Sequence, residues 1–73
     1  MIEWTGNLED DCCAMWGGLF LHVEEMDRNL WWWAVYDAED EIIDTSNNYE
    51  KKFKNGKDTR LAAEIAAKTY VGI

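Results

Sequence analysis

The sequence predicts an α+β fold: an antiparallel meander of three or four strands with a C-terminal α-helix packed on one face, within a single domain of residues 1–73. Short aromatic and β-branched runs separated by polar turns are typical of neighbouring antiparallel strands. The last third of the chain is alanine-rich, with apolar residues at helical spacing. A chain of 73 residues that is 48% hydrophobic can build one small core.

Residues 7–16 fit two interpretations. The Gly17-Gly18 pair between two apolar runs favours a hairpin, which makes residues 12–16 a first strand. Alternatively, Asn7 caps a helix that carries the acidic run 9–11 in its first turn and stops at Gly17. We favour the strand.

Three further strands follow from composition and short connections. Residues 19–25 alternate loosely, residues 30–36 are aromatic with a β-branched end, and residues 41–45 contain an Ile pair. Polar turns at 27–29 and 37–40 join them, so we expect antiparallel neighbours. Residues 46–57 are expected to form a polar loop.

The final element is a helix that begins after the turn sequence Asn55-Gly56-Lys57. Asp58 or Thr59 can cap it, and Gly72 marks its end. One stripe is expected to pack on the sheet, and it consists of Leu61, Ala62, Ile65, Ala66 and Thr69.

Strand alternation divides the run Trp31-Trp32-Trp33 between two faces. We place Trp31, Trp33 and Val35 in the core beneath the helix. Trp32 and Tyr36, with Phe20 and His22 from the preceding strand, would then form an open aromatic patch, the kind of surface that marks interaction sites. In the alternative, residues 1–16 with Trp4 and Trp16 cover this patch.

Charge is distributed unevenly along the chain. Residues 1–50 hold thirteen acidic residues and one basic residue, a net of −12, whereas residues 51–73 hold two acidic and six basic residues, a net of +4. Nucleic acid and anionic lipid attract cations, so we expect neither as a direct partner. A protein with a basic surface would be attracted.

No catalytic or cofactor motif accompanies these features. His22 has no nucleophile motif or phosphate loop beside it, so we expect no enzyme and no cofactor. The acidic turn lacks the glycine and spacing of an EF-hand, so no metal is expected. Adjacent Cys12 and Cys13 are expected to be reduced and mostly buried.

The residue patterns Trp31-x-Trp33-x-Val35, Ile42-Ile43 and Ala62-Ala63-Glu64-x-Ala66-Ala67 occur in this order along the chain. The arrangement resembles small uncharacterised phage and bacterial proteins that combine a Trp-rich meander with an Ala-rich C-terminal helix. This resemblance covers roughly residues 13–70 and implies a meander-plus-helix fold and a phage origin. The resemblance assigns no functional role to any residue of this chain.

The leading functional hypothesis is therefore a non-enzymatic, acidic protein-binding module. In its concrete form, a phage-encoded inhibitor occupies the basic nucleic-acid-binding surface of a host protein. The expected contact residues are Trp32, Tyr36, Phe20, Asp37, Glu39, Asp40 and Glu41. The alternative is a small homodimeric assembly protein that pairs through its aromatic sheet face. The start of the chain lacks the basic and apolar stretches of a secretory signal, so a cytoplasmic location is expected.

Overall fold

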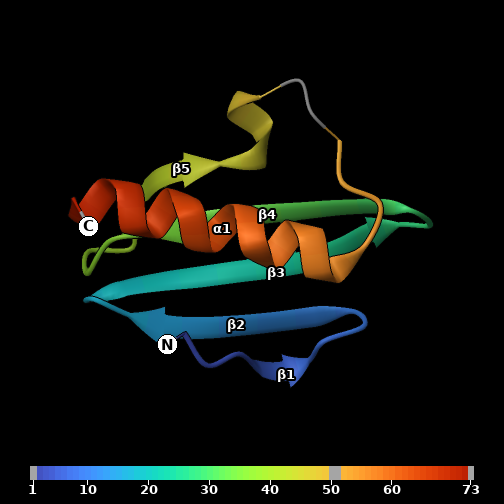
Figure 1. Cartoon of the computed structure of the whole chain (residues 1–73), viewed down its shortest axis with the longest axis horizontal. Helices are drawn as coiled ribbons and strands as arrows, with labels where there is room; N and C mark the ends of the chain where they lie inside the picture. The colour runs from blue at the N-terminus through green and yellow to red at the C-terminus, as the bar shows by residue number, and fades with distance from the viewer. Residues whose placement is uncertain (1, 50–51, 73) are drawn as a thin grey trace.

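One antiparallel sheet with a helix across it forms the architecture of the computed structural model, which describes residues 2–49 and 52–72 (Figure 1). Its strands lie side by side in chain order, and they are β1 (Thr5–Asn7), β2 (Asp11–Trp16), β3 (Leu19–Asp27), β4 (Leu30–Tyr36) and β5 (Ile42–Thr45). A 3-10 turn, η1 (Ser46–Asn48), follows β5, and helix α1 (Gly56–Val71) ends the chain. The α+β class, the antiparallel meander and the C-terminal helix are confirmed. The prediction of three or four strands is wrong, because the described residues form five.

The additional strand comes from the start of the chain. β1 pairs with β2 in a hairpin that sets Thr5 opposite Cys13, so the helical alternative for residues 7–16 is excluded. Asn7 does not cap a helix; its side chain accepts a hydrogen bond from the backbone N–H of Glu9 at 2.9 Å and shapes the turn. Gly6 has a φ of +94°, and a Cβ there would lie 2.8 Å from the Asp11 carbonyl oxygen. A strand of three exposed residues around a glycine has no apolar alternation to reveal it.

The core lies between the sheet and α1, on the side predicted for it. Trp31 is 6% exposed, Trp33 is 3% exposed and Val35 is fully buried. Trp4 and Trp16 pack against this same core. The alternative in which they cover the Trp32 side of the sheet is therefore wrong.

Helix α1 turns a different face to the sheet than the sequence stripe predicts. Its fully buried residues are Thr59, Ala63 and Ala67, whereas Leu61 and Ile65 are each 56% exposed. Small side chains face the sheet because the sheet itself supplies the large core side chains, which include Leu21, Val23, Val35, Trp31 and Trp33. The predicted packing stripe is therefore only partly correct. Its members Ala62 and Ala66 pack at the margin of the core, whereas Leu61, Ile65 and Thr69 are exposed.

The first turn of α1 lies directly above Trp31. A Cβ on Gly56 would approach the Trp31 ring to 2.9 Å, so only glycine fits the described packing. Asn55, not Asp58 or Thr59, is the N-cap, and its side chain accepts a hydrogen bond from the Asp58 N–H at 2.8 Å. Gly72 ends the helix, as predicted, and the structure shows that it does so in the left-handed conformation.

Two long-range hydrogen bonds hold one flank of α1 toward the N-terminal strands. The Trp4 indole Nε1 donates to Glu64 Oε2 at 2.7 Å. Arg60 Nη1 donates to the Leu8 carbonyl at 2.9 Å. In Figure 1 the helix accordingly crosses β3 and β4, while β5 lies beyond its opposite flank.

The segment expected to be a polar loop contributes to the core. Phe53 is 7% exposed, and its carbonyl accepts a hydrogen bond from the Trp31 N–H at 2.9 Å. The same two residues form an isolated β-bridge. Lysines surround Phe53 in the sequence, and its single apolar side chain gave no periodic pattern to predict this contact.

The helix orientation predicts opposite outcomes for two neighbouring substitutions. Ala63→Leu should destabilise the protein by about 1–3 kcal/mol, because it overpacks a buried contact with the sheet. Leu61→Ala should change stability by no more than about 0.5 kcal/mol, because Leu61 is largely exposed. Urea unfolding followed by circular dichroism measures both. A larger loss from Leu61→Ala than from Ala63→Leu would contradict this helix orientation.

Candidate functional site

The sheet surface opposite α1, here called the open face, carries a row of apolar side chains. Strand register pairs Met15 with Phe20, Phe20 with Tyr36, and Tyr36 with Ile42, so one row crosses four strands from β2 to β5. Residues that are direct partners in an antiparallel pair share a face. Met15 is 71% exposed and Ile42 is 53% exposed, which leaves both ends of the row open to solvent.

Aromatic contacts continue from this row along the open face. The Phe20 ring lies 5.9 Å from that of Tyr36 and 6.3 Å from that of His22, measured between centroids. His22 in turn meets Trp32 edge to face at 5.5 Å. The four predicted patch residues are therefore brought together, each half-buried against its neighbours.

Acidic groups flank the aromatic residues at one end of the open face. Asp11 Oδ1 lies 2.7 Å from His22 Nε2, and Glu24 stands directly opposite Trp32 in the register. Register places on this face the β2–β5 residues Asp11, Cys13, Met15, Phe20, His22, Glu24, Trp32, Ala34, Tyr36, Ile42 and Thr45. None of these residues is a lysine or an arginine.

The acidic turn between β4 and β5 borders the other end. Asp37 directly follows Tyr36, and its Oδ1 accepts hydrogen bonds from the N–H groups of Glu39 at 2.8 Å and Glu41 at 3.0 Å. Asp40 has a φ of +64°, a left-handed conformation that Asp tolerates in turns. Asp37 therefore shapes the turn, while the exposed Glu39, Asp40 and Glu41 present charge next to the apolar row.

All seven residues predicted for partner contact thus lie on the open face or in its adjoining turn. Sequence reasoning missed Met15 and Ile42, the two most exposed members of the row. Alternation along residues 12–16, read with the Gly17-Gly18 hairpin, could have placed Met15 opposite Phe20. Ile42 could not have been placed, because a register shift between Val35 and Tyr36 decides which Ile of the pair joins this face.

Two further observations concern metal binding and the cysteines among the described residues. No group of three or more His, Cys, Asp or Glu side chains in residues 2–49 and 52–72 could hold a metal ion. Both cysteines are free thiols, and burial raises the pKa of Cys12 above 9.0, which disfavours the reactive thiolate. In the described part of the chain, α1 is too short and too polar to cross a bilayer.

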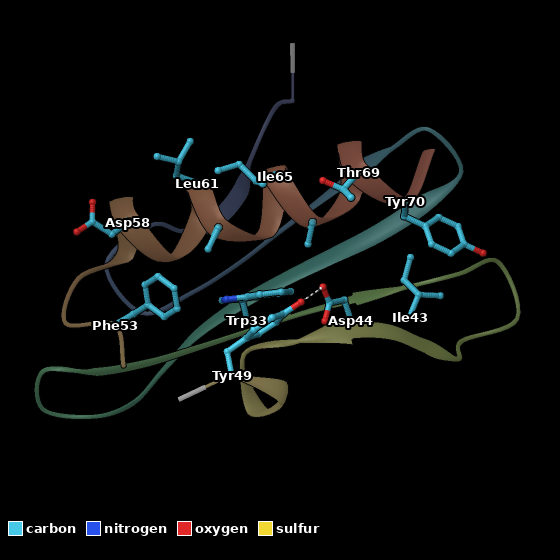
Figure 2. A pocket seen from close by; sticks show the side chains of 12 residues that line it. Trp33, Ile43, Asp44, Tyr49, Phe53, Asp58, Leu61, Ile65, Thr69 and Tyr70 are labelled. Carbon is cyan, nitrogen blue, oxygen red and sulfur yellow. Dashed lines mark hydrogen bonds between the residues drawn. The ribbon is translucent and has the colours of Figure 1, made fainter. Parts of the chain in front are cut away.

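A concave surface lies on the helix side of the sheet and is here called the helix groove (Figure 2). It has a volume of about 690 Å³. Its lining residues are Trp33, Ile43, Asp44, Tyr49, Phe53, Asp58, Leu61, Ala62, Ile65, Ala66, Thr69 and Tyr70. The exposed stripe of α1 therefore forms one wall, and β5 with the segment after it forms the other.

The wall opposite the helix contains a strong polar contact. The Tyr49 hydroxyl donates to Asp44 Oδ2 at 2.8 Å, and its ring stacks on Trp33 with centroids 6.1 Å apart. This hydrogen bond to the Asp44 carboxylate raises the pKa of Tyr49 above 10.0, because ionised Tyr49 would lose the bond and repel the carboxylate.

No protein-family model matches the chain, and comparisons with curated proteins and with solved structures give no significant match.

The Asp44–Tyr49 contact predicts a change in one tyrosine titration. Asp44→Asn should lower the pKa of Tyr49 toward 10.0 by removing the carboxylate. Since the pKa is raised in the folded protein, the contact stabilises the fold below pH 10.0 and loses this effect as pH rises through the folded pKa. A ¹³C NMR titration of labelled Tyr Cζ atoms measures the shift.

Asp58→Asn is the control for this titration, because Asp58 also lines the helix groove but is hydrogen-bonded to Asn55. It should leave the Tyr49 titration as in the wild type. Equal shifts from both substitutions would show that general charge, and not the direct hydrogen bond, controls Tyr49.

Proposed function

We propose that the protein is a non-enzymatic protein-binding module that contacts its partner through the open face. The observation that carries this proposal is the continuous apolar row from Met15 to Ile42, exposed at both ends and bordered by acidic groups. Exposed contiguous apolar surface rimmed by polar residues is typical of protein interaction sites.

The aromatic side chains provide contact area at low entropic cost. Phe20, Tyr36 and Trp32 are already held by ring contacts with one another or with His22, so binding would order few additional rotamers. Tyr and Trp are also enriched among residues that dominate interface energies. We therefore place the centre of the interface at Phe20 and Tyr36.

The charge pattern selects the partner. With a chain net charge of −8, and with acidic groups at both ends of the open face, a basic protein surface is the complementary partner. Such attraction accelerates encounter and disfavours acidic competitors. If that surface binds nucleic acid, this module would compete with the nucleic acid and act as an inhibitor. A phage origin for such an inhibitor stays a prediction.

The same charges disfavour the homodimer alternative. Two copies that pair through the open face would bring their acidic turns, or the turn of one and Glu24 of the other, into one interface. Like charges at an interface cost free energy unless cations intervene, and register places no Lys or Arg of β2–β5 on this face. Lys52, which lines a hollow with Trp32, is the cation beside it in the described residues.

Site-specific photo-crosslinking tests the proposal. A photoreactive amino acid replaces Met15, or in a second protein Ile65, which is similarly exposed but lies on the helix side. We expect the Met15 position, and not the Ile65 position, to crosslink a protein with a basic surface. A crosslink to a second copy of the chain would instead establish the homodimer.

Binding to the captured protein is then measured with Met15→Lys, which removes apolar contact and adds a charge that a basic surface repels. We expect affinity to fall at least about tenfold, equivalent to roughly 1.4 kcal/mol. Ile65→Lys adds the same charge on the opposite side and should leave affinity within about twofold of the wild type. Equal effects of the two substitutions, or an acidic partner, would contradict the proposal.

A further inference from the structure

The helix groove contains a buried hydrogen-bond donor without a partner. Trp33 is 3% exposed, and its indole Nε1 has no acceptor among the described residues. Buried polar groups are nearly always hydrogen-bonded, because an unpaired one loses its hydration without compensation. Trp4, by comparison, pairs its indole N–H with Glu64. The unpaired donor of Trp33 therefore needs a physical explanation.

Trp33 is held rigidly in place by its backbone and its ring. Its carbonyl accepts a hydrogen bond from Thr45 Oγ1 at 2.9 Å, and its N–H donates to Ser46 Oγ at 3.2 Å. Its ring stacks on Tyr49. Figure 2 shows the ring beneath the helix wall of the groove, with the indole nitrogen on the side of Phe53. The donor thus belongs to the floor of the groove.

The groove has the dimensions and lining of a small-molecule site. Its volume of about 690 Å³ lies within the range of roughly 300–1,000 Å³ that ligand pockets occupy. Leu61 and Ile65 on one side, with Ile43 and Phe53 on the others, supply apolar contact. A few placed polar groups in such a lining fix a ligand's orientation.

The charged groups of the groove restrict the ligand further. Asp44 and Asp58 are the charged residues in its lining, and both are acidic. An anionic ligand such as a fatty acid would be repelled, whereas an uncharged molecule would not. The partnerless indole N–H calls for a hydrogen-bond acceptor on that molecule.

We propose that the helix groove binds an uncharged apolar small molecule whose carbonyl oxygen accepts a hydrogen bond from Trp33 Nε1. The site is separate from the open face, because α1 and the apolar row lie on opposite sides of the sheet. The indole N–H is fully buried and the Trp33 ring is fixed by its contacts, so binding includes the shift of a side chain beside the indole, an adjustment that is common at binding surfaces.

The groove also depends on a register shift in the sheet. Val35 pairs with Asp44, whereas Tyr36 pairs with Ile42, so Ile43 is the additional residue of a β-bulge. Both Ile43 and Asp44 line the groove as a result. Bulges are over-represented beside functional sites, where they re-aim side chains.

An NMR titration with the uncharged ketone 2-octanone tests the proposal, with octanoate as the anionic probe of equal chain length. The readout is the indole ¹H–¹⁵N resonance of Trp33, assigned by its disappearance in Trp33→Phe. We expect saturable binding of 2-octanone with a downfield shift of this resonance, and at least about tenfold weaker binding of octanoate. No saturable shift at Trp33, or equal binding of both probes, would overturn the proposal.

Two variants complete the test. Ile65→Lys places a long charged chain on the exposed groove wall and should weaken 2-octanone binding at least about fivefold, while Met15→Lys on the open face should leave it unchanged. Equal losses of 2-octanone affinity in the two variants would overturn the proposal.

Sedimentation is measured in parallel to detect self-association. A self-association that Ile65→Lys abolishes would also overturn the proposal, because it would show that a second copy of the chain covers the groove. Because Met15→Lys tests the open face, failure of one proposal leaves the other standing.

Discussion

The close approach of small helical residues to large aromatic residues of the sheet is the constraint on which the rest of the structure depends. Trp31 and Trp33, together with Leu21, Val23 and Val35, fill the space beneath α1. The helix approaches this surface through its buried small residues, which are Gly56, Thr59, Ala63 and Ala67. Bulk on the sheet and small side chains on the helix together give the packing density of a protein interior. In so short a chain, the two tryptophans supply much of the available apolar area.

This packing leaves apolar groups exposed on both sides of the molecule. On the helix side, Leu61 and Ile65 project beyond the core, because the small face of α1 already fills the contact with the sheet. The hydrogen bonds of Trp4 and Arg60 hold the helix toward the N-terminal strands, and β5 is left at the far flank of the groove. On the opposite side, the row from Met15 to Ile42 has no helix above it. The two proposed sites therefore lie on opposite sides of the sheet.

Acidic side chains have different roles in different places, which net charge alone does not reveal. Glu64 accepts a hydrogen bond from the Trp4 indole N–H and Asp37 organises the β4–β5 turn, so both stabilise the fold. Asp44 holds Tyr49 against Trp33 and thereby builds a groove wall. Glu39 and Glu41 are exposed beside the apolar row, where their charge would attract the basic partner proposed above.

The sequence by itself determined the antiparallel meander, the C-terminal helix and the inward side of Trp31 and Trp33, because these follow from local periodicity and short turns. The sequence also predicted that one face of the sheet carries Phe20, His22, Trp32 and Tyr36, since side chains alternate between the two faces along any strand. Only the tertiary structure decided which face of α1 packs, because a stripe of Leu61 and Ile65 and a stripe of Ala63 and Ala67 are both compatible with helical spacing. The choice depends on the volume of the core side chains that β3 and β4 present to the helix. Contacts between distant segments, which no local pattern encodes, also produce three further features. These are the unpaired Trp33 donor, the bulge at Ile43 and the buried Phe53.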